Sequence, residues 1–323
     1  MEVIIPLTIM SNNISLDSKI YIAGHKGMVG SACLRLFQLR GYKNLIFKTS
    51  KELDLRNQIK VNSFFKEQQP DAVIIAAARV GGIHANDTYG YDFLMDNLLI
   101  QNNLISASEN YSVKKVIFLG SSCIYPKMSP QPIKEKYLLT GPLEETNQWY
   151  AIAKISGVKA IEALNKYKNK NYLSLMPANL YGPNDNYDLN TSHVLPALIR
   201  KFHEGKLNNH SDVILWGTGK PLREFLHVND LAEAILFSLL NNLKSDLYNV
   251  GSGYEISIID LALKVQKIVG HKGIIRWDNS KPDGTLRKLL DSNRLIKNGW
   301  KSKIDIETGI KDVYQEFSNK TQK

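Results

Sequence analysis

The first half of the chain alternates short apolar runs with segments in which apolar residues recur at helical spacing. Near-continuous apolar runs are typical of parallel strands that are covered on both faces. Between the first two runs, Val29–Gln38 has apolar residues every three or four positions, and Gly41 supplies a stop soon after. Strands that alternate with helices predict an α/β fold with a doubly wound parallel sheet. The expected strands are Lys19–Ala23, Leu45–Lys48, Ala72–Ala78, Lys115–Gly120 and Tyr172–Pro177.

The pattern changes after Leu180, where the turn-rich segment Tyr181–Asn186 begins. A helix near His193–Glu204, a strand at Val213–Trp216 and a loop broken by glycine and proline at Gly217–Pro221 come next. This mixture of short elements indicates a smaller substrate-binding domain in the C-terminal part. We therefore expect three parts, which are a loose extension over residues 1–18, a nucleotide-binding domain over 19–183 with a returning segment near 224–250, and a substrate-binding domain over 184–223 and 251–323.

The composition is that of a globular protein with a large core, since 43% of the 323 residues are hydrophobic. No apolar run reaches the ~18 residues of a membrane span. The first residues lack the basic start and the cleavage site of a signal peptide. Two cysteines are too few for a disulfide framework and fit a reducing compartment, so we expect a cytoplasmic protein.

The formal net charge of +10 arises from 41 Lys and Arg against 31 Asp and Glu. A solvated, lysine-rich surface accounts for such an excess, but a positive field also attracts polyanionic ligands. The basic residues are scattered and no nucleic-acid-binding motif is present. We therefore expect small phosphorylated ligands, with no nucleic acid, no membrane and no metal.

A glycine-rich turn joins the first expected strand to the first expected helix. Glycines allow a tight turn and a close approach of the backbone to a pyrophosphate, and the free N–H groups of the helix N-terminus attract the anion. Three glycines alone often mark only a turn, but a strand before them and a helix after them predict a Rossmann-type dinucleotide-binding fold. The residues of this turn are Gly24, His25, Lys26, Gly27, Met28, Val29 and Gly30.

The end of the second expected strand bears on the choice between NAD and NADP. NAD-binding proteins hold the ribose hydroxyls with an acidic residue about 20 positions after the glycines. Here Lys48 and Lys51 stand at that place, and Lys26 adds positive charge within the turn. Lysines attract the extra phosphate of NADP and a carboxylate repels it, so we expect NADP(H). Asp54 and Leu55, just beyond, are placed to meet the adenine edge.

Tyr150 and Lys154 are four residues apart at the start of a helical segment and therefore share one helix face. An ammonium beside a phenol lowers the pKa of the phenol, which suits proton transfer to a carbonyl that receives a hydride. This spacing also occurs by chance on surface helices, but the glycine turn earlier in the chain favours the catalytic interpretation. Ser121, at the end of the fourth expected strand, would face the same site and hold the carbonyl.

With these residues in hand, the chain resembles the GDP-L-fucose synthases of the extended short-chain dehydrogenase/reductase superfamily, from about Lys19 to Phe317. The segments GSSCIYPK (Gly120–Lys127) and SHVLPA (Ser192–Ala197) are the most specific to this family. The other matching segments are AGHKGMVGS (Ala23–Ser31), AAARVGG (Ala76–Gly82), YAIAK (Tyr150–Lys154), PANLYGP (Pro177–Pro183), REFLHVND (Arg223–Asp230) and KPDGT (Lys281–Thr285).

The resemblance implies a two-part chemistry at one site. A GDP-linked 4-keto-6-deoxy-D-mannose is epimerised at C3 and C5 and is then reduced at C4 by NADPH, giving GDP-L-fucose. Ser121, Tyr150 and Lys154 match the family's reduction residues, while Cys123 and His193 match its base and acid for epimerisation. A thiol and an imidazole have pKa values near neutrality, which suits inversion of a carbon next to a ketone. Taken alone, Cys123 would be a small buried residue and His193 a surface histidine.

The matching motifs also imply ligand contacts and an assembly. Cofactor contacts are expected at the glycine turn and at Ala76, Ala78, Pro177, Asn179 and Leu180. Arg223 suits a diphosphate because a guanidinium binds phosphate with two prongs. The family further implies a homodimer. The remaining expected substrate-binding residues are Lys201, Trp216 and Asp283.

Three departures from the family pattern stand out. The family tends to have arginine where this chain has Lys201, and lysine keeps the charge but loses the two-pronged geometry. The glycine turn often has arginine at the position of Lys26. Residues 1–18 have no counterpart in the resemblance.

Cys33, the other cysteine, falls on the apolar face of the first expected helix, and we expect it to be a core residue.

Two other functions remain open from the sequence. A nucleotide-sugar 4,6-dehydratase or 4-epimerase of the same superfamily is one, although a dehydratase would have an Asp-Glu pair where this chain has Ser122-Cys123. A non-catalytic, NADP-sensing regulator is the other, although such proteins usually lose the Tyr or the Lys that this chain retains.

Overall fold

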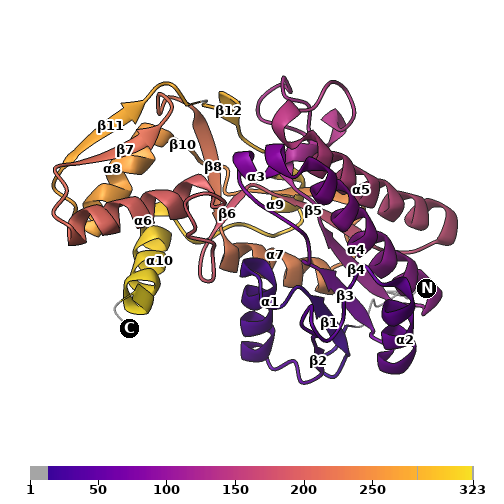
Figure 1. The fold of residues 1–323 in the computed structure, drawn as a ribbon. Helices are drawn as coiled ribbons and strands as arrows, with labels where there is room; N and C mark the ends of the chain where they lie inside the picture. Colours follow the sequence, from indigo (N-terminus) through magenta and orange to yellow (C-terminus); the bar gives the residue numbers. More distant parts are fainter. Residues whose placement is uncertain (1–13, 282, 322–323) are drawn as a thin grey trace, which may run out of the picture.

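The computed structural model describes residues 14–281 and 283–321 (Figure 1). Its main sheet has six parallel strands in the order β2-β1-β3-β4-β5-β9, which confirms the predicted doubly wound α/β fold. Every residue of β1, β3, β4 and β5 is buried, as continuous apolar runs require in a sheet covered on both faces. The strands are β1 (Ile20–Ala23), β2 (Leu45–Ile46), β3 (Ala72–Ile75), β4 (Lys115–Leu119), β5 (Leu173–Pro177) and β9 (Leu247–Val250).

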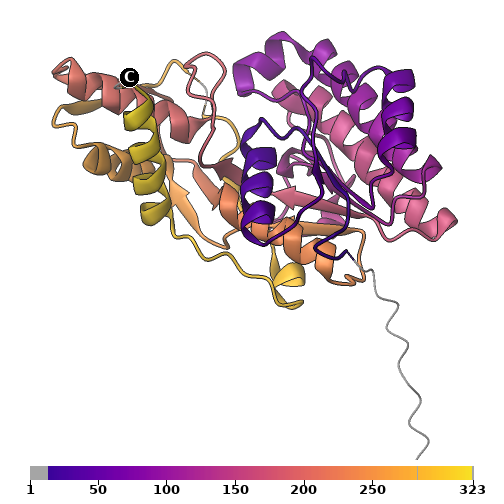
Figure 2. The same ribbon diagram turned by 90° about the horizontal axis from the view of Figure 1, so that it is seen from below.

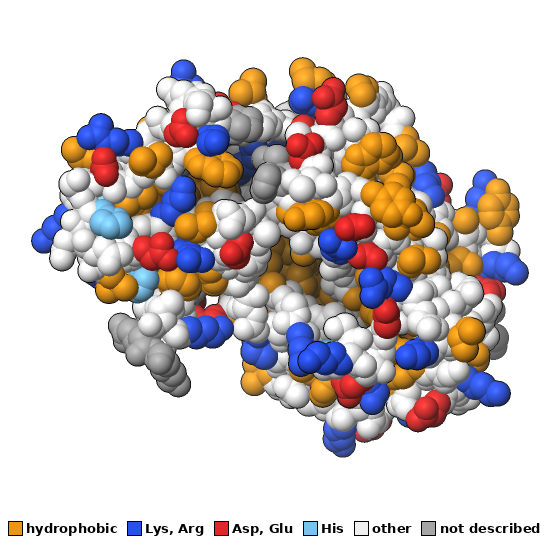
Figure 3. All heavy atoms as spheres, viewed as in Figure 1, with side chains coloured by type: hydrophobic (Ala, Val, Ile, Leu, Met, Phe, Trp, Pro, Cys, Tyr) orange, Lys and Arg blue, Asp and Glu red, His pale blue; other side chains and the backbone are white. Residues whose placement is uncertain are grey.

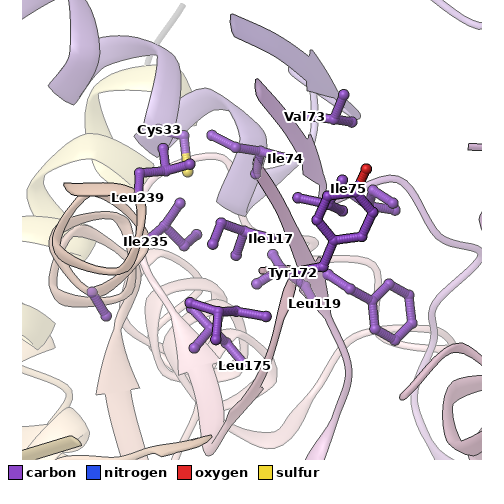
Figure 4. Packing of buried hydrophobic residues seen from close by; sticks show 14 of the residues in the cluster. Cys33, Val73, Ile74, Ile75, Ile117, Leu119, Tyr172, Leu175, Ile235 and Leu239 are labelled. Atoms are coloured by element: carbon purple, nitrogen blue, oxygen red, sulfur yellow. The ribbon is translucent and has the colours of Figure 1, made fainter. Parts of the chain in front are cut away.

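Helices cover both faces of this sheet (Figures 1 and 2). One face is covered by α1 (Met28–Leu39) and α7 (Val228–Leu240), and the other by α2 (Gln58–Gln68), α4 (Gly90–Asn110) and α5 (Gln148–Lys168). Figure 4 shows Cys33 of α1 and Leu239 of α7 packed among the aliphatic side chains of the central strands. Cys33 is fully buried in this core, where the apolar face of α1 is expected to lie.

Two strands end earlier than the sequence predicts. β2 stops at Ile46 instead of Lys48, and β3 stops at Ile75 instead of Ala78. Beyond β2, the ring of Phe47 lies on the ring of His25, with 4.8 Å between centroids. Beyond β3, the side chain of Asn97 binds both backbone groups of Arg79. These segments leave the sheet because they bind other loops at its carboxyl edge, where ligands of such folds sit.

The end of the expected N-terminal extension is ordered against the sheet. Ile14 and Ser18 are buried, Lys43 N donates to Leu16 O, and Asn44 Nδ2 donates to Asp17 O. Residues 14–18 are therefore part of the folded domain rather than a loose segment. Residues 1–13 of the expected extension lie outside the described residues.

The second part of the molecule has a hydrophobic core of its own between α6, α8, α10 and the short strands beside them (Figure 2). In its main sheet β8 lies between β10 and β12, and β6 also pairs with β8. Within residues 14–281 and 283–321, no helix combines the length and apolarity needed to cross a membrane. The elements are α3 (Ile83–Thr88), β6 (Asn179–Tyr181), α6 (Val194–Leu207), β7 (Asp212–Trp216), β8 (Leu222–His227), β10 (Glu255–Ser257), α8 (Ile258–Val269), β11 (Ile274–Asp278), β12 (Arg287–Lys288), α9 (Asn293–Ile296) and α10 (Ile306–Thr321).

Candidate active site

The glycine turn after β1 is packed so tightly that side chains are excluded from it. Gly24 has a φ of +88° and contacts the backbone of Ala77, and a Cβ on Gly30 would lie 2.2 Å from Gly24 O. Gly27 caps α1 without a side-chain hydrogen bond, and the first turn of α1 contains no acidic residue. The N-terminus of α1, with Met28 and Val29 in its first turn, is therefore open to an anion.

Glu52, an acidic residue that sequence reasoning missed, lies close to the predicted Lys48 in the segment after β2. The carboxylate of Glu52 accepts hydrogen bonds of 2.7 Å from the backbone N–H and the hydroxyl of Thr49, and Lys48 Nζ lies 3.8 Å from it. These bonds, followed by the charges of Lys48 and Lys26, hold the pKa of Glu52 below its usual range. The signal was present in the sequence as Lys48 and Glu52 four residues apart. Lys51 is exposed in the same turn.

Asp54 and Leu55 lie just beyond, at the predicted adenine edge. Arg56 donates to both carboxylate oxygens of Asp54 at 3.0 Å, and this bonding lowers the pKa of Asp54. The carbonyl of Leu55 accepts from Asn103 Nδ2 at 2.9 Å, which ties this loop to α4. The predicted adenine-binding loop is therefore held by hydrogen bonds, and its Asp54 carboxylate is already paired with Arg56.

Two further predicted cofactor segments flank the same edge of the sheet. Ala76 N donates to Ala23 O, and Ala76 and Ala78 are partly buried beyond β3. Pro177 ends β5, while Asn179 and Leu180 belong to β6 and are partly buried. The side-chain amide of Asn179 donates to Glu224 O, so it helps to join β6 to β8.

Ser121 and Cys123 lie directly after β4, where the chain forms the 3₁₀ turn Ser122–Ile124. Ser121 Oγ accepts a hydrogen bond of 3.3 Å from the backbone N–H of Cys123. The Cys123 side chain is buried, and this burial raises the pKa of its thiol. The charges of Lys288 and Lys154 and a hydrogen bond with Ser121 act in the opposite direction.

Tyr150 and Lys154 come from the first turns of α5. Lys154 Nζ donates to Leu119 O at 2.9 Å and lies 5.7 Å from the centroid of the Tyr150 ring. Burial lowers the pKa of Lys154 to about 8, and a charge on Cys123 opposes this shift. The sequence predicts a lowered pKa for Tyr150, but burial, followed by a charge on Cys123, raises it instead. In this structure Tyr150 is therefore a protonated phenol, which is a proton donor.

His193 caps α6, which belongs to the second part of the molecule. It is related to Cys123 through the charge of Lys288, a residue that sequence reasoning missed. His193 is exposed as a residue, but partial withdrawal of its imidazole from water and then the charge of Lys288 lower its pKa. Lys288, on β12, acts electrostatically on both His193 and Cys123. Nothing in the sequence around Lys288 marks it, because its role depends on pairing of β12 with β8 far along the chain.

Cys123 and Lys288 also line one small cavity of about 30 Å³, together with Glu144, Asn147 and Thr285. This volume holds one or two water molecules. Figure 3 shows a larger hollow at the centre of the molecule, between the part that carries α1 and the part that carries α6. The small cavity itself lies between the two parts, because Cys123 follows β4 and Lys288 belongs to β12.

The four predicted substrate-binding residues form two adjoining groups in the second part. Trp216 is exposed, with the ammonium groups of Lys201 and Lys281 at 5.8 and 5.5 Å from its ring centroid. Asp283 accepts from the backbone and hydroxyl of Thr218, both at 2.7 Å, and its carbonyl accepts from Arg223 Nη2 at 3.4 Å. An aromatic face between two cations, beside a guanidinium, suits a base and a diphosphate.

Comparisons with known proteins identify the family of the chain. Residues 20–251 match the model of the NAD dependent epimerase/dehydratase family. The chain is similar to a putative GDP-L-fucose synthase 2 of Arabidopsis thaliana, with 53% identity over 93% of this chain and 91% of the relative. It is also similar to GDP-L-fucose synthase of Escherichia coli K12, with 48% identity over 93% and 96% of the two chains.

Among solved structures, a GDP-mannoheptose C4 reductase from Campylobacter jejuni with NADP bound superposes with a TM-score of 0.88. It is 40% identical, and the match covers 95% of this chain and all of the other. The fold and site define a nucleotide-binding epimerase or reductase of the extended short-chain type. The chain belongs to the NAD dependent epimerase/dehydratase family and, within it, to the GDP-L-fucose synthases.

Proposed function

We propose that this protein makes GDP-L-fucose by epimerising GDP-4-keto-6-deoxy-D-mannose at C3 and C5 and then reducing C4. The observation that carries the proposal is the grouping of two sets of proton-transferring residues at one cleft. Tyr150 with Lys154 suits a reduction, whereas Cys123 shares a cavity with Lys288, whose charge acts on both Cys123 and His193. A plain reductase or 4-epimerase has no use for the second set. Family membership supports the same assignment.

The glycine turn fits a dinucleotide. Gly24 and Gly30 leave no room for side chains, and the N-terminus of α1 is open to a pyrophosphate. Lys26 and Lys48 would neutralise the additional phosphate of NADP, which supports NADP(H) as the cofactor. When bound, NADPH supplies the hydride that reduces C4. The adenosine side would be held by the Asp54–Leu55 loop, and the nicotinamide side by Ala76, Ala78 and the Pro177–Leu180 segment.

In the reduction, Tyr150 donates a proton to the C4 oxygen while Ser121 holds that oxygen with a hydrogen bond. Burial keeps the phenol protonated until the oxygen gains charge. Lys154 is anchored on the Leu119 carbonyl, so its ammonium group stays close to the phenol and stabilises the phenolate that forms. The phenol, the serine and the lysine therefore provide binding, proton delivery and charge stabilisation.

In the epimerisation, the protons at C3 and C5 are acidic because the C4 ketone delocalises the charge left behind. The thiolate of Cys123 removes such a proton from one face of the ring, and the imidazolium of His193 returns one to the other face. Both charged forms are minor species near neutral pH, because the pKa of the thiol is raised and that of the imidazole is lowered. The ammonium of Lys288 favours the thiolate and opposes burial. Inversion needs a base and an acid on opposite faces, and residues from the end of β4 and the start of α6 can provide them.

The GDP part of the substrate would lie against the second part of the molecule. Trp216 offers an aromatic face for the base, while Lys201, Lys281 and Arg223 supply positive charge for the diphosphate. Asp283 holds the Gly217–Thr218 turn next to Trp216 through its bonds to Thr218. A lysine at position 201 provides charge without the two-pronged geometry of arginine.

We further propose a cytoplasmic homodimer. Tyr91 and Leu99 on α4 and Ile152 on α5 are exposed, and the two helices pack side by side. Joining these faces in two copies would cover apolar side chains that otherwise contact water. Light scattering coupled to size-exclusion chromatography tests this: we expect twice the 36.5 kDa mass of the chain, and a monomer after Leu99→Glu.

The proposed reaction is tested by incubating the protein with GDP-4-keto-6-deoxy-D-mannose and NADPH. NMR of the product should show the L-galacto configuration, and one NADPH should be consumed per product. Reduction without inversion would indicate another nucleotide-sugar reductase. Cofactor binding without any turnover would indicate the alternative of a non-catalytic, NADP-sensing regulator.

A further inference from the structure

The carboxylate of Glu224 is buried in the second part of the molecule, and within residues 14–281 and 283–321 no Lys, Arg or His forms an ion pair with it. Glu224 follows Arg223 on β8, so the two side chains leave the strand on opposite faces. Arg223 points toward the Asp283 segment, and Glu224 points away from it. A charge in such a place is retained only if hydrogen bonds compensate its loss of water.

Backbone N–H groups supply that compensation. Gly253 N donates to Oε1 at 2.7 Å and Leu290 N donates to Oε2 at 2.9 Å. A Cβ on Gly251 would lie 2.2 Å from Oε1, so the chain approaches the carboxylate as closely as glycine permits. Burial raises the pKa of Glu224 to about 7, while its bonds to Leu290, Gly253 and Ser252 lower it.

The bond to Leu290 is one of several that hold the segment after β12, since Ile133 N donates to Leu289 O, Asp291 N donates to Ile133 O, and Leu290 is buried. β12 has only two residues and pairs with β8 so that Lys288 lies opposite Arg223. Beyond Lys288 the chain leaves β8, and Leu289 N turns to Gln131 Oε1 at 2.9 Å. Leu290 forms an isolated parallel bridge with Ile133, and the Glu224 carboxylate accepts the N–H of Leu290 from β8, two residues from Lys288.

Lys288 lines a cavity with Cys123, as do Lys127 and Arg287, but of these three cations only Lys288 acts on the thiol. The other groups that act on the thiol are Ser121 and Lys154, which are anchored on the nucleotide-binding part. Only Lys288 comes from β12, so its position depends on how that segment is held.

We infer that Glu224 is a positioning residue for the epimerase half of the proposed reaction. It holds the backbone of Leu290 and the Gly253 turn, and thereby fixes the ammonium group of Lys288 beside Cys123. This inference rests on the proposed function for its meaning in catalysis, but its structural content can be measured without substrate.

The measurement is the pH dependence of alkylation of Cys123 by iodoacetamide in the intact protein. The only other thiol, Cys33, is fully buried, and burial raises its pKa to about 12, so it does not interfere. Lys288→Met should raise the midpoint by about one pH unit, because an opposite charge nearby favours the thiolate. Glu224→Gln keeps one acceptor but turns an N–H₂ group toward a backbone donor, and it should shift the midpoint in the same direction.

The double variant decides whether Glu224 acts through Lys288. If it does, Glu224→Gln adds no further shift once Lys288 is methionine. Additive shifts, or an unchanged midpoint in the folded Glu224→Gln protein, would overturn the inference. Glu307→Gln is the control, because Glu307 lies on α10 and binds Lys264 and Lys311, none of which lines the cavity of Cys123. Its midpoint should equal that of the parent.

Glu224→Asp provides a milder variant, because it keeps the charge but cannot reach both donors, and a smaller shift in the same direction is expected. If neither variant unfolds cooperatively, the carboxylate holds the whole fold and the positioning role is wrong. The proposed function fails separately, when the parent protein does not convert GDP-4-keto-6-deoxy-D-mannose to the L-galacto product even though the alkylation midpoints behave as described.

Discussion

The two sides of the candidate site are built in different ways. The cofactor side is made by one short stretch, Gly24–Gly30, whose shape follows from glycines that leave no room for side chains. The epimerase side is assembled from the end of β4, the start of α6 and the two-residue strand β12. A change in the first acts through local backbone packing, whereas a change in the second acts through contacts between distant segments.

The largest effect is expected at the epimerase side, which is assembled from distant segments. Cys123→Ser should lower deuterium uptake from D₂O at C3 and C5 of the substrate by about 10²- to 10⁴-fold, because a hydroxyl is too weakly acidic to act as the base. The measurement is NMR of the recovered substrate without NADPH. His193→Asn should also stop inversion, but it leaves the thiolate able to exchange a proton on one face. Uptake at the parent rate in Cys123→Ser would show that another group is the base.

Tyr150→Phe should separate the two half-reactions in the opposite sense. Reduction of C4 should fall by about 10²- to 10⁴-fold because the proton donor is lost, while most deuterium exchange at C3 and C5 remains. NADPH oxidation followed at 340 nm, compared with exchange measured by NMR, provides the test. An equal loss of both would mean that the phenol also serves epimerisation.

A smaller effect is expected at the glycine turn of the cofactor side. Gly30→Ala places a Cβ 2.2 Å from Gly24 O, and such overpacking against backbone costs about 1–3 kcal/mol in the free energy of unfolding. Gly27→Ala is the matched control, since its Cβ would lie 3.4 Å from the same oxygen. Thermal unfolding should separate the two variants, and both should bind NADPH less well. Equal stability would show that the turn relaxes around an added methyl group.

The same contrast explains what the sequence could and could not predict. The doubly wound sheet and the α1 core followed from apolar runs and helical spacing, because burial on both faces leaves a strong pattern. Ser121 and Tyr150 were found from motifs, although their assigned roles stay predictions. The boundaries of the three expected parts also stay predictions, although residues 14–18 are ordered and Leu290, Leu295 and Trp300 pack in the core of the nucleotide-binding part.

Lys288 and Glu224 could not be predicted, because Lys288 lies outside the matching motifs and the motif REFLHVND contains Glu224 without indicating a role for it. Lys288 matters through a strand of two residues, and Glu224 is a charge in a position that a strand pattern assigns to the core. The direction of the Tyr150 pKa was mispredicted for a related reason. Helical spacing reveals the neighbouring Lys154, but only the folded structure reveals how far the phenol is withdrawn from water.

The smallest effect is expected after β2 on the cofactor side, where Lys48 and Glu52 carry opposite charges. Lys48 and Glu52 lie 3.8 Å apart, both are exposed, and exposed pairs interact weakly. If Lys48 contributes to the choice of NADP, Lys48→Gln should lower the ratio of kcat/KM for NADPH to that for NADH by a few-fold. Glu52→Gln should raise the same ratio, because it removes a carboxylate that repels the additional phosphate. It keeps a side chain that can still accept from Thr49. The two variants must therefore shift the ratio in opposite directions, and salt should weaken both effects. A parent protein that prefers NADH, or two shifts of the same sign, would show that the charges at the end of β2 do not select the cofactor.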